Sequence, residues 1–508
     1  MNAISRRKFL KNCAIGAGAV MASQFWLDKL IAGGIPASAD DILAGQFGIA
    51  DEDIRRILEK ALSRGGDFAD VFFEYKIANS ISMEEDIIKN SSESISLGIG
   101  IRVLKGRQTG YGYTSDLSQE KIDQAALTAA AIANSNAKVK VAGFESVKPP
   151  HQVYDLTAPF RDVDIDGKIG LVRKAYDAAV KYDQQVKKVS AGLTDTIQYV
   201  LIANSEGLKS YDVRPQTRLM VSSTAENGSS RNTGFDNGGG RVGMNFFKNV
   251  KTPEEIGKNA SKEAIILLGA ESAPAGSMPV VLSKDQSGVM IHEAVGHPLE
   301  ADGNWKKTSI MWDKMNQMVA DPSITIFDDA TIPDYRGSLN IDDEGTPTRS
   351  VPLIEGGRLV GYLNDRLSAD ILKHEPNGHG RRQSFRHPPI PRMNNTVLAA
   401  GDHEPGEIIE SVDKGFYAVS YQGGMVQGTG KFTFSVNLGY LIENGKITKP
   451  LKNTTLIGTN VQILKEVDMV GNDMGFFLGT CGKDGQSVPV TAGTPTLKIK
   501  NMTVGGAA

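Results

Sequence analysis

The sequence predicts an α+β protein in which small N-terminal α+β domains precede a β-rich C-terminal domain. Three observations predict this class. Segments of the first half alternate apolar and polar residues, as strands do, and between them lie segments with the apolar spacing of helices. The second half is dominated by alternating runs with Gly-Gly or Asn-Gly between them, which is typical of hairpins. A chain of 508 residues is long enough for two or three domains.

Residues 1–39 have the layout of an export signal. SRRKFLK at 5–11 places paired arginines before a mildly apolar run, and ASA at 37–39 has the form of an A-x-A cleavage site. The basic pair resembles the twin-arginine signal, which implies export of an already folded protein to the periplasm or the medium. We expect cleavage after Ala39, with a short basic amphipathic anchor as the alternative.

The charge balance argues against nucleic acid as a partner. Removing residues 1–39 takes five from the 56 basic and one from the 59 acidic residues, which leaves 51 and 58 and a net charge of −7. Phosphate binding needs a concentrated basic surface instead. No stretch after the N-terminus approaches the roughly 20 apolar residues of a membrane-spanning helix. We therefore expect a soluble protein with no nucleic-acid partner and no membrane contact after signal removal.

We expect an N-terminal α+β domain at 48–150. Its pattern predicts, in order, a helix, two strands and a second helix: 51–65, 69–82, 94–106 and 117–137. The short polar segment GYGYTS lies between the second strand and the second helix. A loop rich in proline and other chain breakers near 148–160 marks the expected boundary.

A middle α+β domain is expected at 160–272. The pattern predicts a helix, alternating strands, a flexible loop and a closing helix at 162–184, 186–221, 225–243 and 252–270. The loop is inferred from its many Gly and Asn residues, which tolerate positive φ. These glycines lack the spacing of a phosphate-binding loop.

The C-terminal domain, expected at 277–508, is mostly strand. Hairpins are predicted at 351–363 and 440–451, where Gly-Gly and Asn-Gly separate alternating runs. Near the start of the domain, one helix stands out: SKDQSGVMIHEAVGH, directly after the strand-like MPVVLS.

That helix ends in HEAVGH at 292–297, and HEPNGH at 374–379 repeats its His-Glu-x-x-x-His spacing. Spacing alone is therefore weak evidence for a metal site. Ala294 and Val295 can continue a helix, whereas Pro376, Asn377 and Gly378 favour a turn. Only the first motif places two imidazoles on one rigid element.

An i, i+5 pair lies roughly 140° apart on a regular α-helix, so His292 and His297 cannot comfortably share an ion there. They align where the helix widens by one residue into a π-bulge, which Gly296 eases and Pro298 would end. The alternative is that His297 lies one step past the helix end and folds back. Both versions predict local irregularity.

Cys481 is the only cysteine left after removal of the signal, so no intramolecular disulfide is possible. Taken alone, it is more often a buried structural residue. A catalytic zinc site usually has three protein ligands, and Cys481 is the natural third beside His292 and His297. Glu293 is then placed as general base toward zinc-bound water attacking a peptide carbonyl. The expected cofactor is Zn²⁺, held on this metal-binding helix.

Four stretches carry a family resemblance: HEAVGHPLEAD at 292–302, DDEGTP at 342–347, RRQSFRHPPIPRMNNT at 381–396 and CGKDGQSVPVTAGTPTLKIKNMTVGG at 481–506. They resemble the TldD/PmbA family, described as candidate modulators of DNA gyrase, and specifically its TldD side. The resemblance extends from about Asp70 to the C-terminus. It implies a zinc metalloprotease with an HExxxH helix and a distant cysteine ligand, and by motif match the ligands are His292, His297 and Cys481, with Glu293 as base.

The resemblance also implies an assembly and a substrate. TldD-like subunits pair with themselves or with an inactive PmbA/TldE-like subunit, and the enclosed site admits unfolded or extended peptides. The family is usually cytoplasmic, so the export signal is a departure. Competing interpretations are a non-catalytic partner or scaffold subunit with a structural zinc, and a nucleophilic role for Cys481.

The sequence is less specific about which residues bind the peptide. An extended peptide could add to a sheet edge through backbone hydrogen bonds. Arg381, Arg382 and Arg392 could hold its carboxylate or carbonyls, although salt bridges within a loop are an equal interpretation. The remaining histidines are expected to be surface or hydrogen-bonded residues rather than ligands: His151, His374, His379, His387 and His403.

Overall fold

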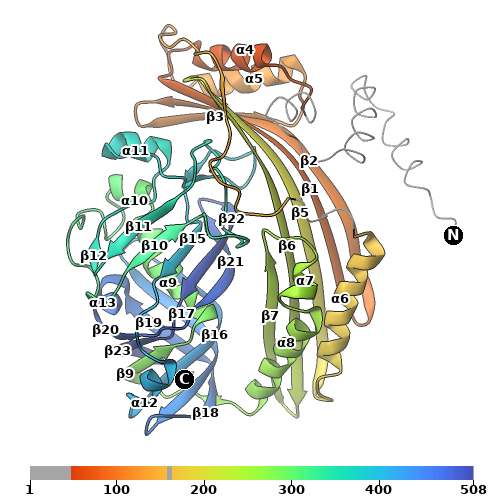
Figure 1. Cartoon of the computed structure of the whole chain (residues 1–508), viewed down its shortest axis with the longest axis vertical. Helices are drawn as coiled ribbons and strands as arrows, with labels where there is room; N and C mark the ends of the chain where they lie inside the picture. The colour runs from red at the N-terminus through yellow and green to blue at the C-terminus, as the bar shows by residue number, and fades with distance from the viewer. Residues whose placement is uncertain (1–46, 157–162, 507–508) are drawn as a thin grey trace, which may run out of the picture.

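The computed structural model describes residues 47–156 and 163–506 (Figure 1). Within these residues, the N-terminal half forms a seven-stranded sheet of order β3-β2-β1-β5-β6-β4, with β7 beside β6. Its strands are β1 Phe68–Glu84, β2 Ile87–Lys105, β3 Gln108–Thr114, β4 Glu145–Val147, β5 Val186–Asn204, β6 Leu208–Asn227 and β7 Ser230–Gly240. Strands from both sides of the expected 148–160 boundary share this sheet. The boundary itself stays a prediction.

Helices lie where apolar spacing predicts them. They are α4 Asp51–Leu62, α5 Gln119–Ala130, α6 Ile165–Val180 and α8 Pro253–Leu268, with the short α7 Phe246–Asn249 before the last. Polar residues at the start of α8 fix where this helix begins. The Thr252 hydroxyl accepts from Glu255 N at 3.2 Å, and the Glu255 carboxylate accepts from Thr252 N at 2.7 Å. Pro253 occupies the first helical position, where its missing N–H costs nothing.

The two faces of the sheet have different partners. On one face, Val71 and Phe73 pack with α4 and α5, and further along β1 Ile81 and Met83 pack with α6 and α8. On the other face, Phe72 packs with Phe385 of the C-terminal half. The strand alternation therefore buries both faces, one under helices and one under the C-terminal domain (Figure 1).

The prediction of a flexible loop at 225–243 is wrong, because β7 occupies most of it. A Cβ on Gly234 would lie 2.2 Å from the Ala260 carbonyl oxygen of α8. The glycine is thus required by the close approach of a helix to the strand, and not by a turn.

The C-terminal half is β-rich, which confirms the predicted fold class. Within the described chain, its eight-stranded sheet contains β8 Glu271–Ser272, β9 Gly276–Leu282, β16 Lys414–Val426, β17 Lys431–Glu443, β18 Lys446–Lys452, β19 Thr454–Thr459, β20 Val467–Val470 and β23 Leu497–Gly505. A six-stranded sheet of order β12-β11-β10-β15-β22-β21 contains β10 Ile326–Asp329, β11 Ser350–Glu355, β12 Arg358–Leu359, β15 Asn395–Leu398, β21 Gly475–Lys483 and β22 Gln486–Thr494. β13 Gly380–Arg381 and β14 Ile390–Pro391 form a small pair.

Both predicted hairpins are present. Gly356 and Gly357 turn β11 into β12, and Asn444 and Gly445 turn β17 into β18, all four with positive φ. The expectation of one helix in this half is too low, since short helices also occur: α10 Ala301–Trp305, α11 Arg366–Leu372, α12 Pro405–Glu410 and α13 Asn460–Lys465. Helices of five to seven residues are too short to show apolar periodicity.

Buried ion pairs join the two halves at the DDEGTP segment. Arg102 of β2 donates to Asp70 of β1 at 2.8 Å and to Glu344 at 2.6 Å, and Arg214 of β6 pairs with Asp343. All of these side chains are buried. These ion pairs hold the C-terminal half against the sheet. Separating the two halves would leave buried charges without partners, which is strongly destabilising.

No helix of the described residues is long and apolar enough to cross a membrane. The predicted signal at residues 1–39 lies outside the described part of the chain.

Candidate metal centre

The backbone at HEAVGH is irregular, as its spacing predicts. After α9 Gly288–Ile291, a π-helical turn (η3) spans His292–Gly296, and a 3₁₀ turn (η4) spans His297–Leu299. The His297 N–H donates to the carbonyl of His292, five residues earlier. A Cβ on Gly296 would lie 1.8 Å from Met393 Sδ, so this position accepts only glycine without rearrangement. The widened turn brings the two imidazoles to one side.

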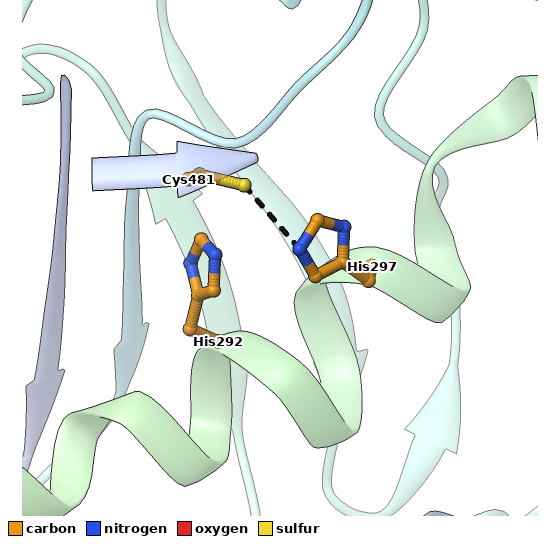
Figure 2. A group of neighbouring side chains, drawn as sticks. All are labelled: His292, His297 and Cys481. Atoms are coloured by element: carbon orange, nitrogen blue, oxygen red, sulfur yellow. Dashed lines mark hydrogen bonds between the residues drawn. The ribbon is translucent and has the colours of Figure 1, made fainter. Parts of the chain in front are cut away.

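His292, His297 and Cys481 meet although 184 residues separate the last two. Their ligand atoms all lie within 4.8 Å of one another, and Cys481 Sγ lies 3.3 Å from His297 Nε2. The imidazole ring centroids are 5.0 Å apart. Figure 2 shows both rings pointing from the irregular turn toward the strand, β21, that carries Cys481. The control motif HEPNGH lies in a non-helical segment after α11, and neither of its histidines joins this group.

The charges of these three groups are coupled. Burial alone would raise the pKa of the Cys481 thiol, but His292 and His297 lower it to about 4. Burial would lower the pKa of His297, but the Glu300 carboxylate and Cys481 raise it well above its usual value. These directions favour an imidazolium beside a thiolate, and the thiolate is the form that binds metal.

Glu293 lines the same cavity as the three side chains. The cavity has a volume of about 710 Å³ and also contains the 423–428 and 480–484 segments in its wall. Burial raises the pKa of Glu293, against the opposing effect of the two histidines. A carboxyl group with a raised pKa beside a metal-ligating set has the properties of a general acid–base.

A buried carboxylate orients His297. Glu300 Oε2 lies 3.0 Å from His297 Nδ1, which leaves Nε2 directed at Cys481. Lys483 Nζ lies 3.2 Å from Glu300 Oε2 and 2.6 Å from Asp302. Burial would raise the pKa of Glu300, but Lys483, His297 and Arg392 lower it to about 2, so Glu300 stays ionised.

The same network reaches Cys481. Arg392, fully buried, donates to the Cys481 carbonyl at 2.6 Å, and its Nε lies 3.7 Å from Glu300 Oε1. The sequence prediction did not include Glu300, which lies three residues after His297, in extended backbone that follows the 3₁₀ turn. The Arg392–Cys481 contact joins residues 89 positions apart, and no local pattern reports it.

The arginines considered for peptide binding have internal partners instead. Arg381 donates to the carbonyls of Met393 and Pro489, and Arg382 donates to the Asp343 carbonyl at 2.9 Å. Both are at most 5% exposed. These contacts are with main-chain carbonyls, whereas the alternative left open was salt bridges within a loop, and peptide binding by these arginines stays a prediction.

The other histidines lie at the surface or form hydrogen bonds, as expected, and among the described residues none belongs to the group of His292, His297 and Cys481. His379, for example, is fully buried between Asp328 and Asn377.

The donor set fits a metal ion that prefers nitrogen and sulfur. Two imidazoles and a thiolate within 4.8 Å match three of the four ligands of zinc. His292 Nδ1 is also buried without a hydrogen-bond partner among the described residues, so that ring is not held by protein contacts at this atom. A metal bound to the group would satisfy polar atoms that are otherwise costly to bury.

Three consecutive segments match the domains of one family. Residues 69–133 match domain 1 of the PmbA/TldA metallopeptidases, residues 158–268 the central domain, and residues 275–506 the C-terminal domain. His292, His297 and Cys481 all lie in the last of these.

Curated relatives match nearly the whole chain. A metalloprotease TldD homolog from Buchnera aphidicola is 38% identical over 90% of this chain and 96% of its own length, and one from Haemophilus influenzae is 38% identical over 90% and 97%. A zinc metalloprotease TldD homolog from Saccharolobus solfataricus is 28% identical over 89% and 99%.

Solved structures share the fold. A protein from Thermotoga maritima, described as a candidate modulator of a DNA gyrase, has a TM-score of 0.74 at 23% identity, covering 90% of this chain and all of its own. TldE from Thermococcus kodakarensis has a TM-score of 0.70 at 21% identity, covering 90% and 99%.

The predicted twin-arginine signal and export are corrected by these comparisons. The matches name metalloproteases of the TldD type, and nothing in them indicates such a signal or export. Paired arginines, a mildly apolar run and an A-x-A tripeptide together form a short pattern that many segments satisfy, and the prediction of export rested on this pattern alone. The periplasmic or extracellular location depended on the same segment and has no other support.

Proposed function

The chain belongs to the PmbA/TldA metallopeptidase family, and we propose that it is a zinc-dependent peptidase that hydrolyses unfolded peptides. One observation carries the proposal. Two imidazoles and a thiolate lie within 4.8 Å of one another, and Glu293 lines the same cavity. A ligand set with a carboxylate beside it, opening into a cavity, is the arrangement of a catalytic site.

In this proposal His292, His297 and Cys481 hold the zinc. When bound, zinc would lower the pKa of water to about 7 and polarise the peptide carbonyl. Glu300 keeps the proton of His297 at Nδ1, so that Nε2 is free for the metal, and Arg392 fixes the backbone of Cys481.

Glu293 moves the protons. Its carboxylate accepts a proton from the attacking water and passes it to the nitrogen of the leaving amine, which completes the hydrolysis of the peptide bond. Partial burial supports this role, because the raised pKa of Glu293 brings the carboxyl group closer to the proton affinity needed near neutral pH.

The substrate is proposed to bind as an extended strand. β21 pairs with β22 on one side only, and it is an end strand of the six-stranded sheet as described. Beyond Ala418, β16 likewise pairs with β17 but no longer with β9, and residues 423–426 line the cavity. Two open strand edges at the metal site can bind a peptide backbone with little sequence preference.

We also propose that the subunit works as a homodimer or as a heterodimer with a PmbA/TldE-like subunit. The likeness of this fold to that of TldE is consistent with subunits built on one plan. The competing function, a scaffold subunit with a structural zinc, has no need of Glu293 in the cavity.

The test is metal content and hydrolysis of unfolded peptides by the full chain, beside Glu293→Gln and Cys481→Ser. We expect about one zinc per chain in the parent, zinc without cleavage in Glu293→Gln, and loss of both in Cys481→Ser. Zinc binding with equal cleavage by Glu293→Gln would refute the catalytic role of Glu293. Zinc without cleavage in the parent, alone and with a PmbA/TldE-like partner, would favour the scaffold.

A further inference from the structure

Residues 423–428, the wall segment of the metal-site cavity, follow a bend in β16. β16 pairs with β9 through Phe416–Ala418, and beyond Ala418 it pairs with β17 alone among the described strands. The pairing with β17 shifts register at three places between Ala418 and Gly423. Such β-bulges bend a strand and free backbone groups from the ladder. The freed groups need other partners, because an unpaired buried backbone group is costly.

The Tyr421 N–H is bonded by a side chain instead of a strand. It donates to Gln286 Oε1 at 3.2 Å. Gln286 lies in the 3₁₀ turn η2 Asp285–Ser287, which leads directly into α9 and then to His292. The bend in β16 is thus held by the segment that carries the first candidate zinc ligand.

The side chain of Tyr421 makes a second link to that segment. Its Oη lies 3.0 Å from Oγ of the fully buried Ser287 and 3.8 Å from Met290 Sδ. Its ring packs edge-on against Phe434 of β17, with the centroids 6.2 Å apart. Burial raises the pKa of Tyr421 far above its ordinary value, so the hydroxyl stays neutral. One residue therefore joins the strand to the metal-binding helix through its backbone and its side chain.

The same bend is held from the N-terminal half of the molecule. Glu263 of α8, 9% exposed, accepts through Oε1 from Ser420 Oγ and from Asn437 Nδ2, the latter at 2.9 Å. Its Oε2 accepts from the Phe235 N–H at 3.0 Å. Ser420 and Tyr421 both lie at register shifts of β16. The bend is therefore held on one side by α8 and on the other by the segment before the metal-binding turn.

The wall segment itself has little of its own to fix its position. Residues 423–426 are Gly-Gly-Met-Val and have no polar side chain. Gly423 has a φ of +151°, and Met425 is 65% exposed. The place of these residues in the cavity therefore depends on their pairing with β17 and on the bend that precedes them.

We propose that Gln286 and Tyr421 are positioning residues that hold the wall segment at a fixed place relative to the zinc ligands, with Glu263 as the anchor in the N-terminal half. The proposal rests on the function proposed above, because it gives the wall segment a part in binding the peptide. Loss of the Gln286–Tyr421 contact leaves His292, His297 and Cys481 unchanged. Zinc binding should therefore survive this loss, whereas substrate binding should weaken.

The first experiment compares Gln286→Met with Gln286→Glu. The methionine keeps the length of the side chain but has no oxygen to accept from the Tyr421 N–H, whereas the glutamate keeps one. Both variants should hold about one zinc per chain. We expect Gln286→Met to raise KM for unfolded peptides about tenfold with kcat changed by less than about twofold, since a buried donor loses its acceptor. Gln286→Glu should restore most of the parent KM, and Tyr421→Phe should raise KM about threefold.

Hydrogen exchange on the zinc-loaded chain measures the same contact without cleavage. We expect the amides of residues 419–428 to exchange at least about tenfold faster in Gln286→Met and at the parent rate in Gln286→Glu. Residues 288–297 should keep their protection in both variants. Gln124→Met is the matched control, because this exposed glutamine lies on α5 and contacts Lys121.

Unchanged exchange of residues 419–428 in Gln286→Met would overturn the proposal, whether or not a peptide is cleaved. A rise in KM that Gln286→Glu does not reverse, or that comes with loss of zinc, would also overturn it, because either result indicates general damage to the fold. If the parent cleaves no peptide, the proposed function fails, and the exchange rates alone decide whether Gln286 holds the wall segment.

Discussion

Replacing Glu300 with Gln tests whether a buried carboxylate organises the metal site. The variant keeps the size of the side chain and an oxygen that can accept from His297 Nδ1, but it removes the negative charge. That charge faces His297 at 3.0 Å, Lys483 at 3.2 Å and Arg392 at 3.7 Å. In the variant, Lys483 keeps its ion pair with Asp302 at 2.6 Å, whereas Arg392 loses the carboxylate of Glu300 as a partner.

The substitution should lower both the zinc affinity and the free energy of unfolding. Substitution of such supporting partners typically weakens metal affinity 10- to 100-fold, which is about 1.4–2.8 kcal/mol. Removing one partner of a buried ion pair typically costs about 3–5 kcal/mol, and Arg392 should lie at the low end because it retains two carbonyl acceptors. We expect both a weaker zinc Kd in a chelator competition and a lower free energy of unfolding without metal.

Asp302→Asn is the matched control. Among the described residues, Asp302 pairs with Lys483 and does not hydrogen-bond to His297, so its loss should affect stability without a comparable loss of zinc affinity. If Glu300→Gln binds zinc within about twofold of the parent, or if Asp302→Asn loses affinity equally, the orienting role of Glu300 is refuted.

Three further predictions concern the same region. Gly296→Ala should lower the free energy of unfolding by about 1–3 kcal/mol, because its Cβ would meet Met393 Sδ at 1.8 Å. The control is Gly143→Ala, whose Cβ would have nothing within 4 Å, and its Tm should equal that of the parent. Equal Tm values for the two variants would contradict the packing argument. Iodoacetamide should modify Cys481 of the zinc-free protein at pH 6, because its pKa is about 4, and zinc should protect it; modification unaffected by zinc would exclude Cys481 as a ligand. The depressed pKa of Glu300, about 2 against 4.5, contributes stability that is present above pH 4.5 and is lost as pH falls through 2. That contribution is about 3 kcal/mol, with about 2 lost by pH 3, so urea unfolding of Glu300→Gln should be less sensitive to acid than that of the parent.

Local chemistry predicted the irregular helix correctly. The i, i+5 spacing requires a widened turn, and HEAVGH can form one where HEPNGH cannot, because Ala294 and Val295 continue a helix. The main strands, the helices with clear apolar spacing and both hairpins were predictable for the same reason: their determinants lie within a few residues of one another.

What the sequence could not supply depends on contacts between distant residues. The glycines of β7 give the composition of a loop, and only the close approach of Ala260 explains Gly234. Arg392 belongs to a stretch rich in arginine, and nothing local distinguishes peptide binding from its observed contact with the Cys481 backbone. Gln286 belongs to no motif, so its bond to the Tyr421 N–H appears only in the folded chain.

The burial of the candidate metal site restricts which substrates can reach it more strongly than the identity of its three candidate ligands does. Cys481 is 3% exposed and His292 is 4% exposed, so a peptide bond can reach them only by entering the cavity. A folded protein presents backbone groups that are already paired, and it would have to lose those hydrogen bonds before it could join the edge of β21 or β16. An unfolded chain has no such cost beyond ordering the residues that bind.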